Sequence, residues 1–170
     1  MTVNKKLAIF DLDHTILKCN SDHSWLDYLI NKGFIKREEY FEQNAEFQKK
    51  FREGNVNYKD YYEFTIQYLK DNSDDYISDI RSDFMKEIIE PSINIYALRL
   101  IHKHYEKNEE LLLASGTTSI IAGPIAKRLE FKNVVCTTCE KENNIYTGRI
   151  EDPPSLGAVS YTHLRAHETN

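Results

Sequence analysis

The feature that most constrains this chain is a short apolar run that ends in two closely spaced carboxylates. Residues 7–10 read Leu-Ala-Ile-Phe, and Asp11 and Asp13 follow directly. An uninterrupted apolar run of this length is typical of a parallel strand covered on both faces. We therefore expect Asp11 and Asp13 at the carboxyl end of a central strand, which is where open parallel sheets bind ligands.

Two further apolar runs predict the rest of such a sheet. They are residues 111–114 and residues 134–136, and helical periodicity lies between them. The order strand, helix, strand, helix, strand predicts a parallel sheet with right-handed crossovers. Residues 136–150 then indicate a hairpin with Asn143 and Asn144 in its turn.

The stretch between the first two strands is helical throughout. Apolar stripes at helical spacing predict four helices within residues 21–90, and we assign their Tyr and Phe side chains to packing. Gly33 and Gly54 stop the first two helices, while Asn57 and Ser73 cap the next two. Four consecutive helices without a strand predict a helical insertion in the sheet-forming fold.

Two prolines are expected to break helices. Pro91 ends the fourth helix of the insertion, and Ser92 then caps the next helix. The helix that follows the second strand is expected to be interrupted at Gly123 and Pro124.

Composition excludes several classes of partner. The net charge is −5, with charges of mixed sign making up 29% of the chain, so nucleic acid and anionic membranes would be repelled. No apolar run approaches membrane-spanning length, and the N-terminus does not resemble a secretory signal. Three sparse cysteines, Cys19, Cys136 and Cys139, favour a cytoplasmic location, and we interpret the last two as structural.

The paired carboxylates suit chemistry at phosphorus. Two buried carboxylates repel one another, and a cation relieves that cost; oxygen ligands favour magnesium. Asp11 or Asp13 could attack phosphorus while the other transfers protons. Ser115 with the Gly116 amide, near a helix N-terminus, suits a phosphate oxygen. A solvated turn is the alternative for the bare spacing; the strand before it and the Asp-His-Thr turn favour a functional site.

The segment FDLDHTIL resembles the first signature of the haloacid dehalogenase-like superfamily, Asp-x-Asp-x-Thr after an apolar strand. The similarity continues through NSDHSWLDYLINKGFI, LLLASGTTSIIAGPIAKRL and IYTGRI to the phosphoserine-phosphatase-like branch, which includes histidinol-phosphatase-type members. It covers roughly residues 5–157. The resemblance implies an α/β fold, a Rossmann-like parallel sheet, incomplete in this chain, with an inserted helical cap. The core would comprise residues 1–17 and 92–158, and the cap residues 18–91.

The resemblance also implies roles for individual residues. Asp11 would be the nucleophile and a Mg²⁺ ligand, and Asp13 the acid/base, with its main-chain carbonyl on the metal. Ser115, with Gly116 beside it, would bind phosphate. The implied reaction is hydrolysis of a small phosphorylated metabolite, with phosphoserine and histidinol phosphate as candidates.

Three residues enter the cap nearest this site. Ser21, Asp22 and His23 are therefore our candidates for substrate contact. Helix capping by Ser21 or Asp22 is the alternative.

The last twelve residues differ from the rest. Residues 159–170, VSYTHLRAHETN, lack periodicity and resemble the translation of a sequencing-library adapter, so we expect an artefactual tail; a natural disordered tail is the alternative. The family's third-motif lysine would fall near position 160, and its fourth-motif acids beyond the chain. We therefore expect an intact parent to be a phosphatase and this chain to be inactive or nearly so.

Two other functions stay open. A phosphoryl transferase would use the same phosphorylated aspartate, and a non-catalytic ligand-binding protein would keep only the fold. No feature of the sequence indicates an oligomeric state.

Overall fold

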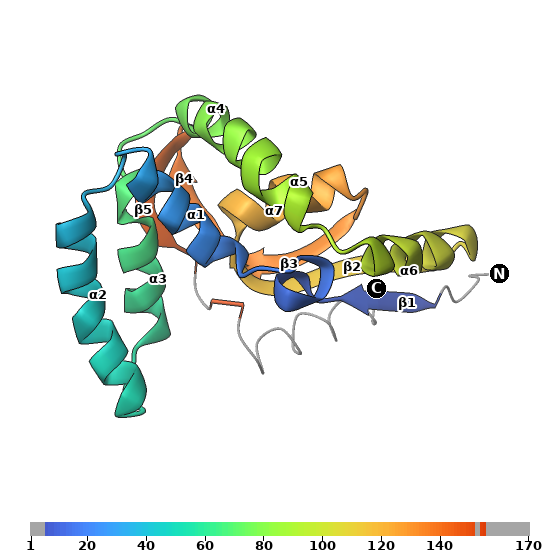
Figure 1. The fold of residues 1–170 in the computed structure, drawn as a ribbon, viewed down its shortest axis with the longest axis horizontal. Helices are drawn as coiled ribbons and strands as arrows, with labels where there is room; N and C mark the ends of the chain where they lie inside the picture. Colours follow the sequence, from blue (N-terminus) through green and yellow to red (C-terminus); the bar gives the residue numbers. More distant parts are fainter. Residues whose placement is uncertain (1–5, 152–153, 156–170) are drawn as a thin grey trace.

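A three-stranded parallel sheet organises the computed structural model, which describes residues 6–151 and 154–155. Its strands are β1 (Leu7–Phe10), β2 (Glu110–Thr118) and β3 (Asn133–Thr137), in the order β1-β2-β3 (Figure 1). The predicted α/β class and the parallel sheet are confirmed. Phe10 pairs with Leu113, so the segments after Phe10 and after Leu113 leave the same edge of the sheet.

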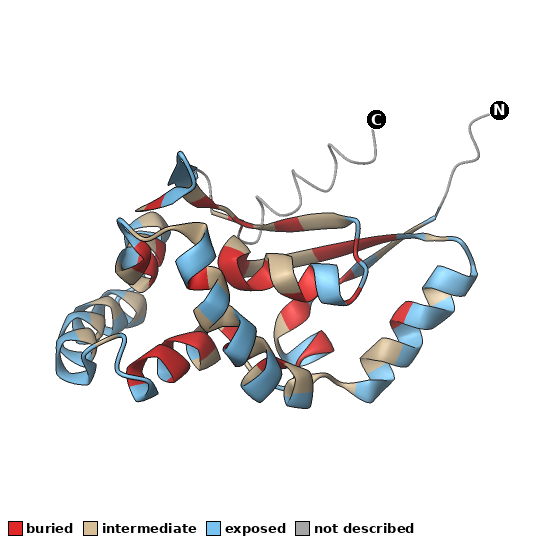
Figure 2. Ribbon diagram, turned by 90° about the horizontal axis from the view of Figure 1, so that it is seen from above, coloured by how far each residue is buried: buried red, intermediate tan, exposed pale blue. Residues whose placement is uncertain are grey.

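Two helices cover one side of this sheet. They are α6 (Ile95–Glu106) and α7 (Ser119–Arg128), which lie on the same side of the strands (Figure 2). Right-handed crossovers require this placement when strand order follows chain order. The core between helices and sheet is apolar, and it includes Phe10, Ile101, Leu111, Leu113, Ile120 and Phe131.

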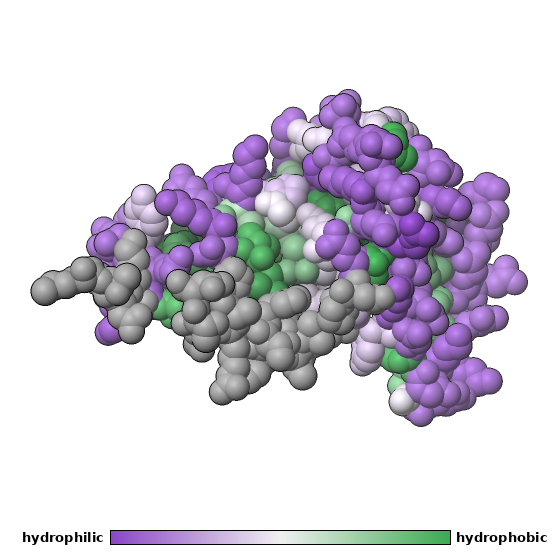
Figure 3. All heavy atoms as spheres, turned by 180° about the vertical axis from the view of Figure 1, so that it is seen from behind, coloured by the Kyte–Doolittle hydropathy of each residue, from purple (hydrophilic) through white to green (hydrophobic). Residues whose placement is uncertain are grey.

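β1 differs from the prediction of a strand covered on both faces. Within the described residues it is the edge strand, and Ile9 is 50% exposed. The side of the molecule opposite to that in Figure 1 also carries apolar side chains between hydrophilic margins (Figure 3). A parallel edge strand with exposed apolar side chains is a site at which chains pair and aggregate.

A group of helices separates β1 from β2, as predicted. It comprises α1 (Ser21–Asn31), α2 (Arg37–Arg52), α3 (Tyr58–Ile66), the short extension η2 (Gln67–Leu69) and α4 (Asp74–Phe84). Asn57 and Ser73 cap α3 and α4 through their side chains, and Gly33 and Gly54 adopt φ values of +79° and +70° after α1 and α2. These four predicted helix boundaries are confirmed.

The helix that was predicted to end at Pro91 extends one residue further. The chain continues from α4 through a wider turn, η3 (Met85–Ile89), into α5 (Glu90–Ser92), and Ile93 is extended. The prediction that Ser92 caps the next helix is wrong, because its Oγ donates to Ile88 O (2.6 Å) and Asn94 caps α6.

The predicted interruption at Gly123 and Pro124 is also wrong, because α7 runs through both residues. Pro124 has no N–H to donate to the carbonyl of Ile120, four residues earlier. The guanidinium of Arg81, from α4, donates to that oxygen instead (Nη1 to O, 3.3 Å). A side chain of another helix therefore replaces the missing main-chain donor.

The hairpin is confirmed, but it lies against the helical insertion. Its strands are β4 (Cys139–Glu142) and β5 (Ile145–Ile150), which stand beside α3 and α4 (Figure 1). Tyr146 exchanges main-chain hydrogen bonds with Asp71 and Asn72 at 3.0 Å, and its hydroxyl donates to Asp74 Oδ1 (2.6 Å). Part of the span 92–158, expected to be core, thus packs on residues expected to be cap.

Replacing Arg81 tests whether its guanidinium takes the place of the missing main-chain donor to Ile120 O. We expect Arg81→Ala to lower the free energy of unfolding by about 1–3 kcal/mol, since it leaves a buried carbonyl without its donor. In a Pro124→Ala background the amide of residue 124 can donate to Ile120 O, so the same change should cost about 1 kcal/mol less. Urea denaturation of the four proteins measures this coupling.

The matched control is Lys86→Ala, which removes an exposed ion pair with Asp83. Its cost should be the same with Pro124 or Ala at position 124. Strict additivity of Arg81→Ala and Pro124→Ala would contradict the explanation.

Candidate functional site

The turn after β1 brings Asp11 and Thr15 together. Leu12 and Ile16 anchor this turn, η1 (Leu12–Ile16), because both side chains are fully buried. His14 takes a left-handed φ of +57°, which lets the chain wrap tightly. Thr15 Oγ1 donates to Asp11 Oδ2 (2.8 Å), and the Asp11 side chain stays exposed to an incoming ligand.

Asp13 is held through both of its carboxylate oxygens. The amide and the hydroxyl of Ser21 donate to Oδ1 at 2.9 and 2.6 Å. The hydroxyl of Thr117 donates to Oδ2 at 3.1 Å. The carboxylate therefore bridges the first helix of the insertion and the end of β2.

Ser115 joins the same hydrogen-bond network. Its hydroxyl donates to Thr117 Oγ1 (3.0 Å), and the Thr117 amide donates back to Ser115 Oγ (3.2 Å). Asp13 and Ser115, which come from two strands, are thus linked through one shared hydroxyl. This is the proximity that the parallel sheet predicted.

The local structure at Ser115 differs from the prediction of a helix N-terminus. β2 continues to Thr118, and α7 begins only at Ser119. The pairing of β2 with β3 shifts between Ala114 and Thr118, where the three intervening residues of β2 face one residue of β3. Such a bulge redirects side chains at a strand end.

Gly116 is fixed by its carbonyl. That oxygen accepts from Tyr62 Oη, on α3, and from Thr137 Oγ1, at the end of β3, both at 2.9 Å. A residue of the insertion therefore holds the peptide next to Ser115. Sequence reasoning assigned the aromatic residues of the insertion to packing, and Thr117 carried no signal at all.

The capping alternative for Ser21 and Asp22 is wrong, because Asn20 caps α1 and accepts from the amide of His23 (2.9 Å). His23 itself is exposed. Asp22 instead accepts from Thr118, both from the hydroxyl (Oδ1, 2.8 Å) and from the amide (Oδ2, 3.2 Å). Ser21 and Asp22 thus join the insertion to consecutive residues of β2.

Burial changes the acidity of Asp22. Desolvation raises the pKa of its carboxyl to about 7; the Thr118 hydrogen bonds oppose that rise, and the negative charge of Asp13 adds to it. Desolvation also raises the pKa of the Cys136 and Cys139 thiols to about 11, which disfavours the reactive thiolate. This supports the interpretation of both cysteines as structural.

Oxygen donors at this site suit magnesium. The exposed carboxylate of Asp11 and the main-chain carbonyl of Asp13 are hard ligands, and Mg²⁺ in proteins takes one or two carboxylates with water and phosphate completing its shell. Residues 6–151 and 154–155 contain no group of three or more His, Cys, Asp or Glu side chains that could enclose an ion. The same part of the chain has no helix long and apolar enough to cross a bilayer.

The comparison with known families agrees with this geometry. The profile of the haloacid dehalogenase-like hydrolases matches residues 8–169, so the chain belongs to that family. It is 32% identical over 161 residues to the histidinol-phosphatase of Neisseria meningitidis serogroup C (strain 8013), covering 94% of this chain and 72% of that protein.

Solved structures share the fold. A protein with unknown function from Bordetella pertussis Tohama I has a TM-score of 0.87 at 27% identity, covering 97% of this chain and 74% of that one. A substrate-bound phosphoserine phosphatase has a TM-score of 0.64 at 16% identity, covering 97% and 71%, a likeness of fold alone. The Rossmann-like class is confirmed. Residues 159–170 lie outside the described residues, the family match extends to residue 169, and their foreign origin stays a prediction.

The raised pKa of Asp22 predicts a pH dependence of stability. The folded protein holds this proton more tightly than the unfolded chain between about pH 4 and 7, so the contribution of Asp22 to stability is present below pH 4 and is lost as the pH rises to 7. Asp22→Asn removes this titration and keeps an oxygen acceptor for Thr118. Relative to the parent, we expect the variant to gain stability with rising pH, by at most about 1.4 kcal/mol per pH unit.

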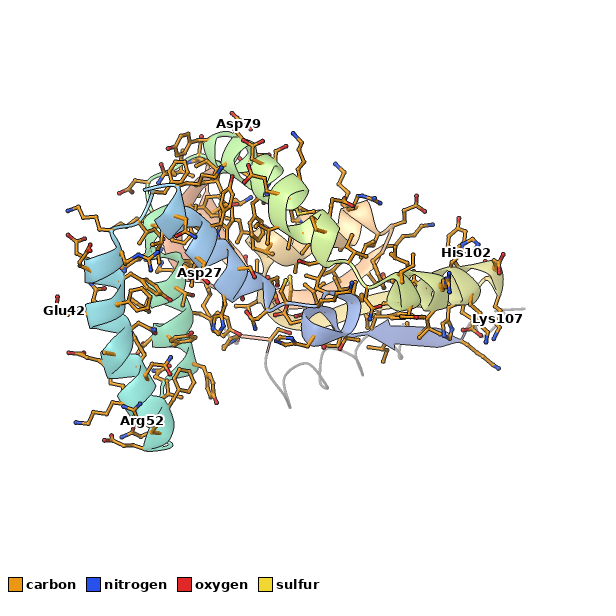
Figure 4. The ribbon with its side chains drawn as sticks, in the orientation of Figure 1. Asp27, Glu42, Arg52, Asp79, His102 and Lys107 are labelled. Atoms are coloured by element: carbon orange, nitrogen blue, oxygen red, sulfur yellow. The ribbon has the colours of Figure 1, made fainter. Side chains whose placement is uncertain are left out.

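Chemical denaturation between pH 4 and 8 measures this difference. Asp27→Asn, an exposed substitution on the same helix (Figure 4), should keep a constant difference from the parent over that range. A constant difference for Asp22→Asn as well would show that the carboxyl titrates normally.

Proposed function

We propose that this chain provides the nucleophile, the acid/base and the phosphate-binding hydroxyl of a magnesium-dependent phosphatase acting on small phosphate monoesters. The observation that carries the proposal is the network in which Asp13 and Ser115 share Thr117, at the strand edge that also presents Asp11. Membership of a hydrolase family supports it. The similarity to proteins named histidinol-phosphatase and phosphoserine phosphatase favours histidinol phosphate and phosphoserine as substrates.

The first half of the proposed reaction is attack on phosphorus. A carboxylate oxygen of Asp11 forms a bond to phosphorus as the ester oxygen leaves, which gives an aspartyl-phosphate. The hydroxyl of Thr15 donates to Asp11 Oδ2, and this hydrogen bond limits rotation of the carboxylate. Protonated Asp13 gives its proton to the departing alkoxide.

The second half regenerates the nucleophile. The Asp13 carboxylate, now ionised, takes a proton from water as that water attacks the phosphoenzyme, and inorganic phosphate leaves. Its oxygens accept three hydrogen bonds, from Ser21 and Thr117, which fix the orientation of the carboxylate for this step. A Mg²⁺ held by the Asp11 carboxylate and the Asp13 carbonyl would neutralise charge on the phosphoryl oxygens.

The Ser115 hydroxyl and the neighbouring peptide are assigned to the phosphate. Ser115 is 6% exposed, so the bulge that carries it presents a nearly desolvated hydroxyl, and electrostatic contacts are stronger in such surroundings. The two hydrogen bonds to Gly116 O hold the peptide that directly follows the Gly116 amide.

Asp11→Asn tests the nucleophile. Because the amide oxygen is a poor nucleophile, we expect Mg²⁺-dependent phosphate release from phosphoserine or histidinol phosphate to fall by at least about 10³-fold. The assay uses the purified protein with saturating Mg²⁺. Asp79→Asn, an exposed change on α4 (Figure 4), is the control and should leave turnover unchanged. Undiminished turnover in Asp11→Asn would refute the assignment.

A phosphoryl transferase would form the same aspartyl-phosphate and would differ from a phosphatase only in the acceptor of the phosphoryl group. Added alcohols that compete with water for the phosphoryl group would indicate a transferase.

A further inference from the structure

Ser21 is the residue through which the helical insertion touches the assigned acid/base. It is the first residue of α1, and its side chain is 0% exposed. Both of its donors, the amide and the hydroxyl, are directed to Asp13 Oδ1. A fully buried hydroxyl used in this way orients a neighbour and is not free to contact a substrate.

The helix start strengthens this contact. The first amides of a helix have no partner within the helix, and they carry its partial positive charge. α1 is 11 residues long, and its first amide is the Ser21 N–H that donates to Asp13. The carboxylate thus receives a hydroxyl, an amide and the positive end of a helix on one oxygen, while Thr117 holds the other.

Two of these three hydrogen bonds disappear if α1 leaves the sheet. Asp22, the next residue, accepts hydrogen bonds from Thr118, and Ser21 Oγ lies 3.3 Å from Thr117 Oγ1, so this end of the insertion is attached to β2 as well as to Asp13. The orientation of Asp13 therefore depends on whether the insertion is docked.

We propose that Ser21 is a positioning residue that couples docking of α1 to proton transfer by Asp13. The inference rests on the proposed function, because it requires Asp13 to act as acid and base. It goes beyond that function because it makes proton transfer depend on the docking of α1 and assigns this dependence to the buried hydroxyl of Ser21.

The opposing interpretation is a structural role, in which Ser21 only stabilises the turn after β1. A structural defect reduces the amount of folded protein and lowers turnover of every substrate by the same factor. A positioning defect depends on the leaving group, since an alkoxide needs a proton from Asp13 and nitrophenolate, a stable anion at neutral pH, does not.

The experiment compares the Ser21→Ala variant with the unsubstituted protein. We expect kcat/KM for an alkyl ester, phosphoserine, to fall about tenfold, and kcat/KM for p-nitrophenyl phosphate to change less than twofold. With p-nitrophenyl phosphate kcat should still fall, and a burst of nitrophenol should appear, because hydrolysis of the phosphoenzyme needs Asp13 as base. If Ser21→Ala does not fold, Ser21→Cys replaces it, with a weaker donor of similar size.

Ser24→Ala is the matched control, since it removes a partly buried hydroxyl of the same helix that donates to Asn20 O and does not contact Asp13. It should leave both substrates unaffected. Equal losses on both substrates in Ser21→Ala would overturn the inference.

A second measurement needs no activity. In the 170-residue chain, Asp13→Ala should speed hydrogen exchange of the Ser21 amide by about tenfold or more, whereas Asp11→Ala should not. Unchanged exchange overturns the inference by itself. If the unsubstituted protein shows no turnover while the Ser21 amide exchanges faster in Asp13→Ala, the proposed function is wrong and the contact between Ser21 and Asp13 stands.

Discussion

The carboxylate of Asp13 is the interaction on which the arrangement of the site depends. It follows β1, it accepts from the start of α1, and it accepts from Thr117 at the end of β2. An ionised group that is partly removed from water is costly unless its hydrogen bonds are made. The positions of the turn after β1, of α1 and of the bulge in β2 therefore depend on one another, because the first carries the carboxylate and the other two supply its hydrogen-bond donors.

The hairpin gives the insertion a second attachment to the sheet-forming part. It leaves β3 and returns along residues 71–74, where Tyr146 exchanges main-chain hydrogen bonds and also donates to Asp74. Tyr62 adds a third link, from α3 to Gly116. The insertion thus meets the sheet at Asp13, at the Gly116 carbonyl and through the hairpin, so a domain boundary drawn only from chain order separates residues that pack together.

Local signals in the sequence predicted most of the fold. Apolar runs marked the strands, and Asn57, Ser73, Gly33 and Gly54 marked helix ends because capping and left-handed φ depend on a few neighbouring residues. Pro124 misled, since the distant Arg81 replaces its missing N–H group, and the helix at Pro91 extends one residue further than predicted. Periodicity records neither effect.

The site divides in the same way. Asp11, Asp13 and Ser115 were found because reactive residues followed apolar strands. Thr117 contacts Asp13 across 104 residues of chain, and Tyr62 contacts the Gly116 carbonyl across 54; hydroxyl side chains at such positions have no distinguishing spacing. Ser21 and Asp22 were selected for their place at the start of the insertion, and their hydrogen bonds to Asp13 and Thr118 required the folded structure.

The donation from Arg81 to Ile120 O has a consequence for how this sequence can change over time. A proline at position 124 costs less stability while an arginine reaches across from α4, so a history in which the arginine preceded the proline, or arrived with it, is favoured. If the proline appeared first, the intermediate sequence would have an Ile120 carbonyl without a hydrogen-bond donor. Among relatives, proline at the position of Pro124 should accordingly be found with a donor at the position of Arg81, and losses of the two should follow in the opposite order.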